Sequence, residues 1–256
     1  MKVVILAGGL GTRLSEETSI KPKPMVEIGG KPILWHIMKL YSQHGYNEFV
    51  VCLGYKGYSI KQWFNDHFLH NSDVTFNLED NTITHHKSRS EKWKVTLVDT
   101  GAETMTGGRI KRIQDYVGNE TFMLTYGDGV SDVDIKKLVD FHKKNKAIAT
   151  ITSVVPEGRY GVLAFDDDAT VVNFGEKIDN KNRVNGGFFV LEPEVFEYLE
   201  GDLIPFEKGP LERLAKDNQL KAFHHDGFWK AMDTLHDKIK LEELWNKGNA
   251  PWKNWD

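Results

Sequence analysis

The chain has 256 residues, of which 40% are hydrophobic, and this is enough for one large α/β domain with a buried core. The formal net charge of −4 gives no overall attraction to nucleic acid or to an anionic membrane, so we expect neither as a partner. No run of about 18 apolar residues is present to cross a bilayer, the N-terminus shows no signal peptide, and the single cysteine, Cys52, lies in an apolar run. These features predict a folded cytoplasmic protein in which any anion site is positive only locally.

A glycine-rich loop follows the first predicted strand. Val3 to Leu6 is an apolar, β-branched run that is typical of a buried parallel strand. Three glycines within residues 8–11 then let the backbone turn sharply and bring its N–H groups close to an anion. Arg13 and Lys23 add two cations shortly afterwards. We interpret this loop as a clamp for a triphosphate, the alternative being an ordinary strand-to-helix turn with incidental charges.

Two better-known phosphate loops do not fit this part of the chain. The Walker pattern needs Ser or Thr after its Gly-Lys pair, but Gly30-Lys31 is followed by Pro32. The dinucleotide pattern would place its third glycine at Leu14.

The strands and helices expected next alternate along the chain. A helix is predicted to open at Gly30-Lys31-Pro32, with the proline in its first turn. A strand at Glu48–Leu53 and a short helix at Ile60–Phe68 follow. Residues 73–87 interrupt this order and predict a hairpin, inserted near a subunit contact or the substrate entrance.

The alternation then resumes and continues to residue 154. Expected strands lie at Val95–Val98, Phe122–Tyr126 and 148–154, and expected helices at Gly108–Val117 and 133–145. From Tyr160 to Leu191 the pattern changes to short strands, which predicts an antiparallel lobe. The remainder predicts helices at 194–200, 210–217 and 235–247 and a strand at 220–224. We therefore expect an α/β fold, with a Rossmann-like, mostly parallel sheet flanked by helices and a small antiparallel lobe laid against it.

Five short segments carry a resemblance to a known family. GGLGTRL at residues 8–14 and KPKPM at 21–25 resemble the signature of the sugar-nucleotide nucleotidylyltransferases. TYGDG at 125–129, NGGFFV at 185–190 and GFWKAMDT at 227–234 resemble the members that join CTP to glucose 1-phosphate. The resemblance extends over essentially the whole chain.

The resemblance implies the fold of the nucleotide-diphospho-sugar transferases in a single domain over residues 1–256. Residues 1–155 would form its nucleotide-binding part and 156–256 its sugar-binding and C-terminal part, with the hairpin at 73–87 as an insertion. By the same resemblance the nucleotide would contact Leu6, Ala7, Gly8, Gly9, Gly11, Thr12, Arg13, Lys23, Thr104, Arg109 and Gly127. Thr104 and Arg109 border a Thr-Gly-Gly step that enters a helix, where free N–H groups favour anions; the alternative is a helix cap plus a surface arginine.

Two aspartates are candidate ligands of Mg²⁺, the expected cofactor. Asp128 follows a predicted buried strand, and a carboxylate at that edge of a sheet suits a cation that takes few protein ligands; an Asp-Gly turn is the alternative. The resemblance implies that Asp233 is the second metal carboxylate, although locally it could be a helix N-cap.

The sugar-phosphate side is assigned by resemblance. Lys177 would pair with the sugar phosphate, and Glu176 and Asn185 would form hydrogen bonds with sugar hydroxyls. The family usually has proline after the Glu-Lys pair, whereas this chain has Ile178, which loosens the expected loop geometry. The remaining residues expected on this side are Tyr126, Gly161, Gly186 and Trp229, the last of which could instead be a core tryptophan.

The chemistry implied by the resemblance needs no nucleophilic side chain. An anionic phosphate oxygen of glucose 1-phosphate would attack the α-phosphorus of CTP in one in-line step, releasing pyrophosphate and forming CDP-glucose. Arg13, Lys23 and the Mg²⁺ bound by Asp128 would neutralise and position the charges. Arg13, Lys23 and Asp128 are the predicted catalytic residues.

Two other functions stay open at this point. The chain could be a uridylyl- or thymidylyltransferase, because base recognition through backbone groups leaves little trace in a sequence. It could also be a non-catalytic nucleotide sensor, which would be expected to lack the phosphate cations or the metal carboxylates. The hairpin and the tryptophan-rich tail predict a homo-oligomer, a trimer or a hexamer.

Overall fold

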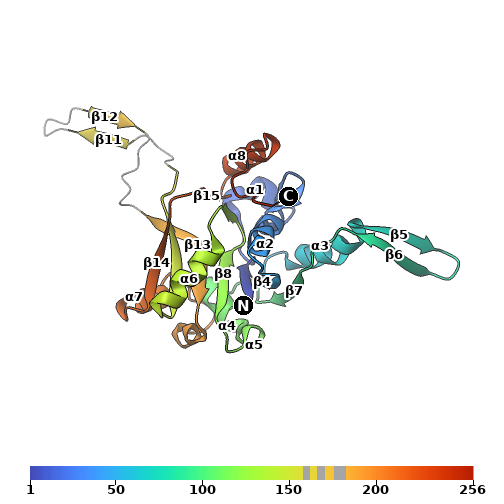
Figure 1. The fold of residues 1–256 in the computed structure, drawn as a ribbon, viewed down its shortest axis with the longest axis horizontal. Coiled ribbons are helices and arrows are strands. Elements are labelled where there is room, and N and C mark those ends of the chain that lie inside the picture. The colour runs from blue at the N-terminus through green and yellow to red at the C-terminus, as the bar shows by residue number, and fades with distance from the viewer. Residues whose placement is uncertain (158–161, 166–170, 176–182, 256) are drawn as a thin grey trace.

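The computed structural model describes residues 1–157, 162–165, 171–175 and 183–255, without the side chains of Arg13, Ser15, Glu16 and of the ranges 162–165 and 171–175. Its centre is a sheet whose seven described strands follow the order β14-β10-β13-β8-β1-β4-β7 (Figure 1). These strands are β1 (Val3–Leu6), β4 (Glu48–Leu53), β7 (Lys94–Asp99), β8 (Phe122–Tyr126), β10 (Ala149–Val154), β13 (Val184–Leu191) and β14 (Leu220–His225).

The directions of the strands confirm the expected Rossmann-like, mostly parallel sheet. β1 lies parallel between β4 and β8, β4 is parallel to β7, and β10 is parallel to β14. β13 is antiparallel to both β8 and β10. Its assignment to the antiparallel lobe was therefore wrong, because the apolar end of this strand is buried inside the central sheet. The antiparallel pair outside the sheet consists of β11 (Val162–Phe165) and β12 (Val171–Gly175).

Alternate residues of the strands pack into two cores, one on each face of the sheet. Val3 and Ile5 of β1 belong to the first core, whereas Val4 and Leu6 belong to the second. Helices α2 (Ile33–Gln43), α6 (Ile135–Asn145) and α8 (Leu235–Asn246) contribute to the first core, and α4 (Thr106–Arg112), α5 (Gln114–Val117), α7 (Pro210–Lys216) and the 3₁₀ turn η3 (Pro193–Tyr198) to the second. Within the described ranges, none of the helices has the length and apolar character that a membrane crossing requires.

Several helices differ from the predicted boundaries: the one expected at Ile60–Phe68 is α3 (Gly57–His70), and the one expected at 194–200 is the 3₁₀ turn η3. The helix expected at Gly108–Val117 is divided into α4 and α5, because the backbone leaves helical geometry at the fully buried Ile113. The proline predicted inside the first turn of α2 is instead its N-cap, Pro32.

Short ladders that the sequence pattern did not predict position the site. β9 (Gly129–Ser131) pairs with β15 (Trp229–Ala231), and β2 (Glu27–Ile28) pairs with β3 (Lys31–Pro32). The first of these ladders continues with the N–H of Met232, which donates to the carbonyl of Asp128 at 2.8 Å. The segments on either side of residues 128 and 233 are therefore fixed against each other.

The tryptophan-rich tail docks onto the body of its own chain. His36 in α2 is fully buried, and its ring lies 4.8 Å from that of Trp245 and 6.2 Å from those of Trp252 and Trp255. The indole N–H of Trp252 donates to His36 Nδ1 at 3.3 Å, and His36 Nε2–H donates to the carbonyl of Ile28 at 2.8 Å. The tail thus packs against α2 next to β2, which follows Lys23 in the chain.

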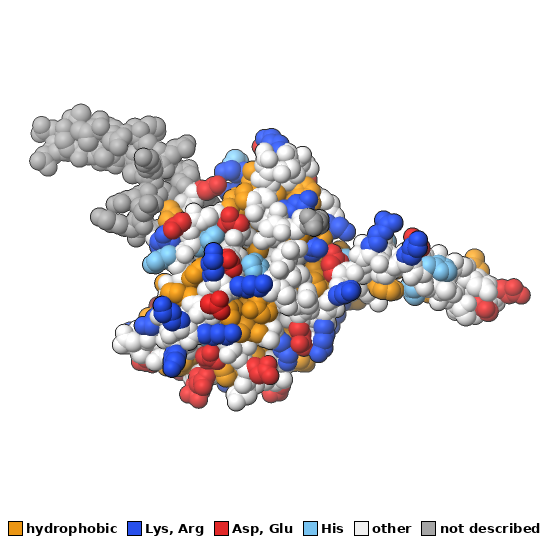
Figure 2. Space-filling model, viewed as in Figure 1, with side chains coloured by type: hydrophobic (Ala, Val, Ile, Leu, Met, Phe, Trp, Pro, Cys, Tyr) orange, Lys and Arg blue, Asp and Glu red, His pale blue; other side chains and the backbone are white. Residues whose placement is uncertain are grey.

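The predicted hairpin is confirmed and projects from the rest of the molecule. β5 (Ser72–Asn77) and β6 (Thr82–Ser88) extend beyond α3 (Gly57–His70) as a two-stranded ribbon (Figure 1). Every residue of β6 is exposed, and the space-filling view shows acidic side chains at the tip of the ribbon (Figure 2).

Candidate nucleotidyl transfer site

A cleft of about 360 Å³ opens at the carboxyl ends of β1 and β8, the edge at which parallel α/β sheets bind ligands. Tyr126 and Asp128 line it. So do all the residues predicted to contact the nucleotide apart from Arg13, whose side chain lies outside the described residues: Leu6, Ala7, Gly8, Gly9, Gly11, Thr12, Lys23, Thr104, Arg109 and Gly127. The structure thus brings the predicted set together in one cleft.

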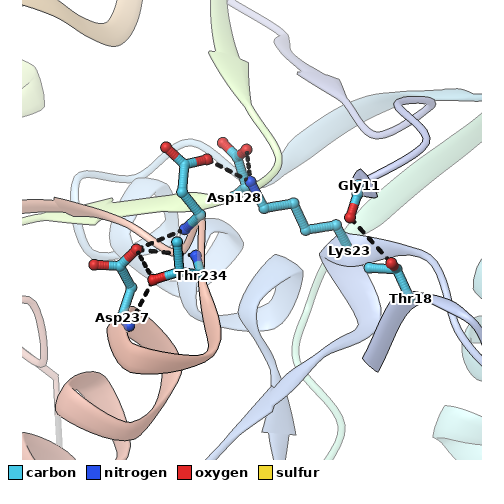
Figure 3. Close-up of polar contacts among 7 residues, drawn as sticks. Gly11, Thr18, Lys23, Asp128, Thr234 and Asp237 are labelled. Carbon is cyan, nitrogen blue, oxygen red and sulfur yellow. Dashed lines mark hydrogen bonds and ion pairs between the residues drawn. The ribbon is translucent and has the colours of Figure 1, made fainter. Parts of the chain in front are cut away.

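Hydrogen bonds from neighbouring segments fix the conformation of the glycine loop. Gly11 has a φ of +66°, a conformation that favours glycine, and its carbonyl accepts from the Thr18 hydroxyl at 3.0 Å (Figure 3). The carbonyl of Gly8 accepts from the N–H of Tyr55 at 3.2 Å, and Lys56 Nζ donates to the carbonyl of Thr18 at 3.2 Å. The loop is therefore positioned in part by the residues that follow β4.

Arg109 is a buried anchor of this loop, 4% exposed, so the alternative of a surface arginine is wrong. A Cβ on Gly8 would lie 2.2 Å from Arg109 Nη1, and one on Gly54 would lie 2.5 Å from it, so both glycines make room for the guanidinium. Its two terminal nitrogens donate to five oxygens: the carbonyls of Leu53 (2.9 Å), Gly101 (2.8 Å), Gly8 (3.0 Å) and Ala102 (3.2 Å) and the hydroxyl of Thr100 (2.8 Å).

Lys23 connects the two predicted metal carboxylates (Figure 3). It lies in the 3₁₀ turn η2 (Lys23–Met25), which has prolines on both sides of the lysine, and is 9% exposed. Its Nζ donates to Asp128 Oδ2 at 2.7 Å and to Asp233 Oδ1 at 2.8 Å. Residues that are 105 and 210 positions from Lys23 in the chain are thus gathered around one ammonium group.

The charges in this cluster stabilise one another. Burial lowers the pKa of Lys23, but the charges and hydrogen bonds of Asp128 and Asp233 raise it by a larger amount. The pKa of Lys23 therefore lies above its usual value. The alternative of a helix cap at Asp233 is wrong, because the N-cap of α8 is Thr234, whose hydroxyl accepts from the N–H of Asp237 at 3.3 Å.

A second cleft, of about 380 Å³, borders the same cluster through Asp233. It is lined by Asp233 together with Pro156, Glu157, Trp229, Lys230, Ala231, Thr234, His236, Asp237 and Lys240. Since the first cleft contains Lys23 and Asp128 and the second contains Asp233, the two clefts meet where Lys23 joins the carboxylates.

The described residues of the predicted sugar-phosphate side are Tyr126, Asn185, Gly186 and Trp229, whereas Gly161, Glu176 and Lys177 lie outside the described part of the chain. The indole N–H of Trp229 donates to the carbonyl of Gly186 at 2.7 Å. Asn185 Nδ2 donates to the Tyr126 hydroxyl at 3.1 Å. Trp229 is thus held beside the Asn185-Gly186 step while it also lines the second cleft.

Several charged residues beside the clefts were missed. Glu157 accepts from Lys230 at 3.1 Å and from Lys240 at 2.6 Å in the wall of the second cleft. Glu207 accepts from the Tyr126 hydroxyl at 2.5 Å near the first. Lys230 belongs to the GFWKAMDT segment, which could have drawn attention to it, but Glu207 carries no comparable signal.

The donor set of the cluster fits a hard divalent cation. Two carboxylates lie within hydrogen-bond distance of a single positive charge, and Mg²⁺ commonly takes one or two carboxylates and completes its shell with water and phosphate oxygens. Across the described ranges, His, Cys, Asp and Glu nowhere gather in a group of three or more suited to a metal. Phosphate oxygens would therefore have to supply part of the coordination.

Three comparisons relate the chain to known proteins. Residues 2–234 match the family model described as nucleotidyl transferase. The whole chain is 57% identical to the glucose-1-phosphate cytidylyltransferase of Salmonella typhi and 44% identical to the probable glucose-1-phosphate cytidylyltransferase of Bacillus subtilis, and each match covers 100% of both proteins. The crystal structure of HddC from Yersinia pseudotuberculosis is similar with a TM-score of 0.69 and 28% identity, over 95% of this chain and 99% of that one.

Proposed function

Since the chain belongs to the nucleotidyl transferase family, we propose that it transfers a cytidylyl group from CTP to α-D-glucose 1-phosphate, with CDP-glucose and pyrophosphate as products. The observation that carries this proposal is the meeting of two clefts at Lys23, Asp128 and Asp233. The choice of CTP and glucose 1-phosphate is supported by the 57% identity, over full length, to the Salmonella typhi protein of that name.

The nucleotide would occupy the first cleft, with its phosphates along the glycine loop. The sugar phosphate would approach from the second cleft, whose lining includes Trp229, and the indole N–H of Trp229 donates to the carbonyl of Gly186. Tyr126, Gly161, Glu176 and Lys177 complete the proposed sugar-phosphate side. The attacking phosphate oxygen is anionic at neutral pH, so the reaction would need no general base and no nucleophilic side chain.

The main barrier is repulsion between two polyanions, together with the charge that develops on the leaving pyrophosphate. Arg13 and Lys23 would neutralise this charge and hold the phosphates in line. Lys23 is already placed for this, because its side chain lies in the wall of the nucleotide cleft. A phosphate in that cleft would compete with Asp128 and Asp233 for the same cation.

Nucleotidyl transferases of this family generally use a divalent metal ion, and we propose Mg²⁺ for this chain. Asp128 and Asp233 would hold it. When bound, the metal supplies positive charge to the phosphates and lowers the energy of the developing negative charge. The protein's own part is to keep the two carboxylates together, which the β9–β15 ladder does.

A panel of nucleoside triphosphates tests the proposal. Purified protein is incubated with glucose 1-phosphate, Mg²⁺ and CTP, UTP, dTTP or GTP in turn, and pyrophosphate release is measured. We expect CTP to give the highest kcat/KM. A preference for UTP or dTTP would assign the chain to one of the two alternative transferases. If no nucleotide gave pyrophosphate release, the non-catalytic nucleotide sensor would be the remaining function.

We also propose that the protein works as a homo-oligomer, a trimer or a hexamer, in the cytoplasm, where nucleoside triphosphates are made. The hairpin supports this, because a lone two-stranded ribbon is marginally stable and this one exposes apolar side chains: Phe76 is 52%, Leu78 89% and Ile83 54% exposed. Light scattering of Phe76→Glu should show a smaller assembly than wild type. Thr75→Glu, on the other face, is the matched control, and a monomeric wild type would contradict the proposal.

A further inference from the structure

A chain of side-chain hydrogen bonds connects the nucleotide cleft with the sugar side. Glu207 accepts from the hydroxyl of Thr106 at 2.7 Å through Oε2 and from the hydroxyl of Tyr126 at 2.5 Å through Oε1. The Tyr126 oxygen in turn accepts from Asn185 Nδ2 at 3.1 Å. Thr106 begins α4 in the wall of the nucleotide cleft, whereas Asn185 lies on the proposed sugar side. Glu207, which has no role in the proposed reaction, lies in the middle of this series of hydrogen bonds.

The carboxylate sets the direction of every hydrogen bond toward Asn185. An ionised carboxylate only accepts, so the Tyr126 hydroxyl must donate to Glu207 and keeps its oxygen lone pairs for the Asn185 amide. Burial and the nearby charge of Glu207 raise the pKa of Tyr126, so its proton stays in place. Asn185 Oδ1 accepts from the N–H of Gly187 at 2.7 Å. A flipped amide would point its NH₂ group at that N–H, and the orientation of Asn185 is thereby determined at both ends.

The backbone around Asn185 is shaped for this contact. Gly187 has a φ of +79°, and a Cβ at this position would lie 2.6 Å from Cδ2 of the Tyr126 ring, so only glycine leaves room for the ring. The register of β13 against β10 shifts between the pairs of Ile151 and Ser153, and Asn185 pairs with Ser153 at the far side of this irregularity. Such irregularities redirect side chains, and this one directs Asn185 toward Tyr126.

We propose that Glu207 is a positioning residue for the sugar phosphate, which it serves by fixing the Asn185 amide through the hydroxyl of Tyr126. This inference rests on the proposed function, in which Asn185 forms hydrogen bonds with a sugar hydroxyl. With one N–H committed to Tyr126 and one lone pair to Gly187, the amide of Asn185 keeps a second N–H and a second lone pair for a ligand. Adjacent hydroxyls of a hexose match such a donor and acceptor pair.

The experiment measures binding and kinetics of Glu207→Gln and Tyr126→Phe. The first substitution brings a donor into a site built for an acceptor, and the second removes the hydroxyl that links Glu207 to Asn185. We expect the Kd of CDP-glucose and the KM of glucose 1-phosphate to rise about tenfold in each variant, while the Kd and KM of CTP stay within about twofold. The double variant should be no worse than the more affected single one, because both changes break the same chain.

Tyr198→Phe is the matched control, since it also removes a hydrogen bond between a tyrosine and a carboxylate. The hydroxyl of Tyr198 donates to Asp217 at 3.0 Å, and neither residue lines either cleft. It should leave every constant unchanged. Melting temperatures of all variants are compared with wild type, and if Glu207→Gln does not fold, Tyr126→Phe decides alone.

Three results would overturn the inference alone: unchanged sugar-phosphate constants in an active background, an equal rise in the CTP and sugar constants, or additive effects in the double variant. A wild-type protein that binds CTP but neither binds CDP-glucose nor turns over glucose 1-phosphate would instead overturn the proposed function.

Discussion

The proposed nucleotide half and the proposed sugar half of the site are held by different kinds of contact. The glycine loop is held through its main-chain carbonyls, which accept from the N–H of Tyr55, the hydroxyl of Thr18 and the guanidinium of Arg109. The described sugar side depends on side chains, in the chain of contacts from Glu207 through Tyr126 to Asn185. Lys23 lies between the halves and contacts carboxylates on both sides.

This difference determines how each half should respond to substitution. A main-chain carbonyl stays in place when its own side chain is changed, so the nucleotide half is sensitive mainly at the side chains that donate to it and at the glycines that make room for them. A chain of side-chain contacts is interrupted by the loss of any one member. The predictions below test this contrast, beginning with the residue that both halves share.

Lys23→Ala should produce the largest effect, because it removes the cation from the junction of the two clefts. Turnover should fall about 100- to 1,000-fold, the usual cost of removing one preorganised group that stabilises transition-state charge. Steady-state kinetics give the measurement. Lys21→Ala is the matched control from the same Lys-Pro segment, since Lys21 pairs only with the exposed Glu27 at 3.0 Å among the ion pairs of the described residues. Equal losses in the two variants would contradict a special role for Lys23.

The protein should lose stability in acid because of the buried His36. Burial lowers the pKa of His36 to about 4, from 6.5 in the unfolded chain. The unfolded state therefore takes up the proton first as the pH falls. The stability contributed by neutral His36 is complete above pH 6.5 and is lost between pH 6.5 and 4, by up to about 3 kcal/mol.

Denaturant unfolding at a series of pH values measures this loss. His36→Gln keeps a donor for the carbonyl of Ile28 and an acceptor for Trp252 but does not titrate, so its stability should be flatter over the same range. An identical slope in the two proteins would assign the loss to other groups.

Asp128→Asn should raise the Mg²⁺ concentration needed for half-maximal activity about tenfold or more, because a charged ligand is replaced by a neutral one. Binding of Mn²⁺ followed by electron paramagnetic resonance gives a second measurement that does not depend on turnover. Asp226→Asn, at an exposed carboxylate that pairs with Arg183, is the control. An unaltered metal titration in Asp128→Asn would remove it from the proposed ligands.

Gly8→Ala is the sharpest test of the nucleotide half, and its effect should appear in stability. The new Cβ would overlap the Arg109 guanidinium and should reduce the free energy of unfolding by about 1–3 kcal/mol. The neighbouring Gly9→Ala meets no atom within 4 Å and should leave stability nearly unchanged. Thermal unfolding of the pair measures the difference, and equal stabilities would mean that Arg109 adapts without cost.

Much of the fold follows from local patterns in the sequence. β1, β4 and β8 were predicted because each is a short apolar run next to glycines or helices. β13 was placed in the wrong lobe because it ends the run of short predicted strands that begins at Tyr160, although its apolar end pairs with β8 and β10. The ladder of β9 with β15 has too few residues to show a period and depends on contacts between distant segments.

The two halves of the site differ in the same way. The glycine loop, Lys23 and Asp128 lie in short distinctive segments, so the sequence indicated them directly. Glu207 lies 81 residues from Tyr126 in a segment without a motif, and only the folded chain brings the two together. Arg109 was expected at the nucleotide, but its buried contacts with carbonyls come from loops that no sequence pattern connects.

The central claim is direct transfer between the two clefts, without a covalent enzyme intermediate. One diastereomer of CTP with sulfur in place of an α-phosphate oxygen, together with glucose 1-phosphate, gives a product whose configuration at phosphorus can be read by ³¹P NMR. A single in-line displacement inverts that configuration, and inversion is the result this account predicts. Retention would mean two successive displacements through a nucleotidyl-enzyme, and would contradict it.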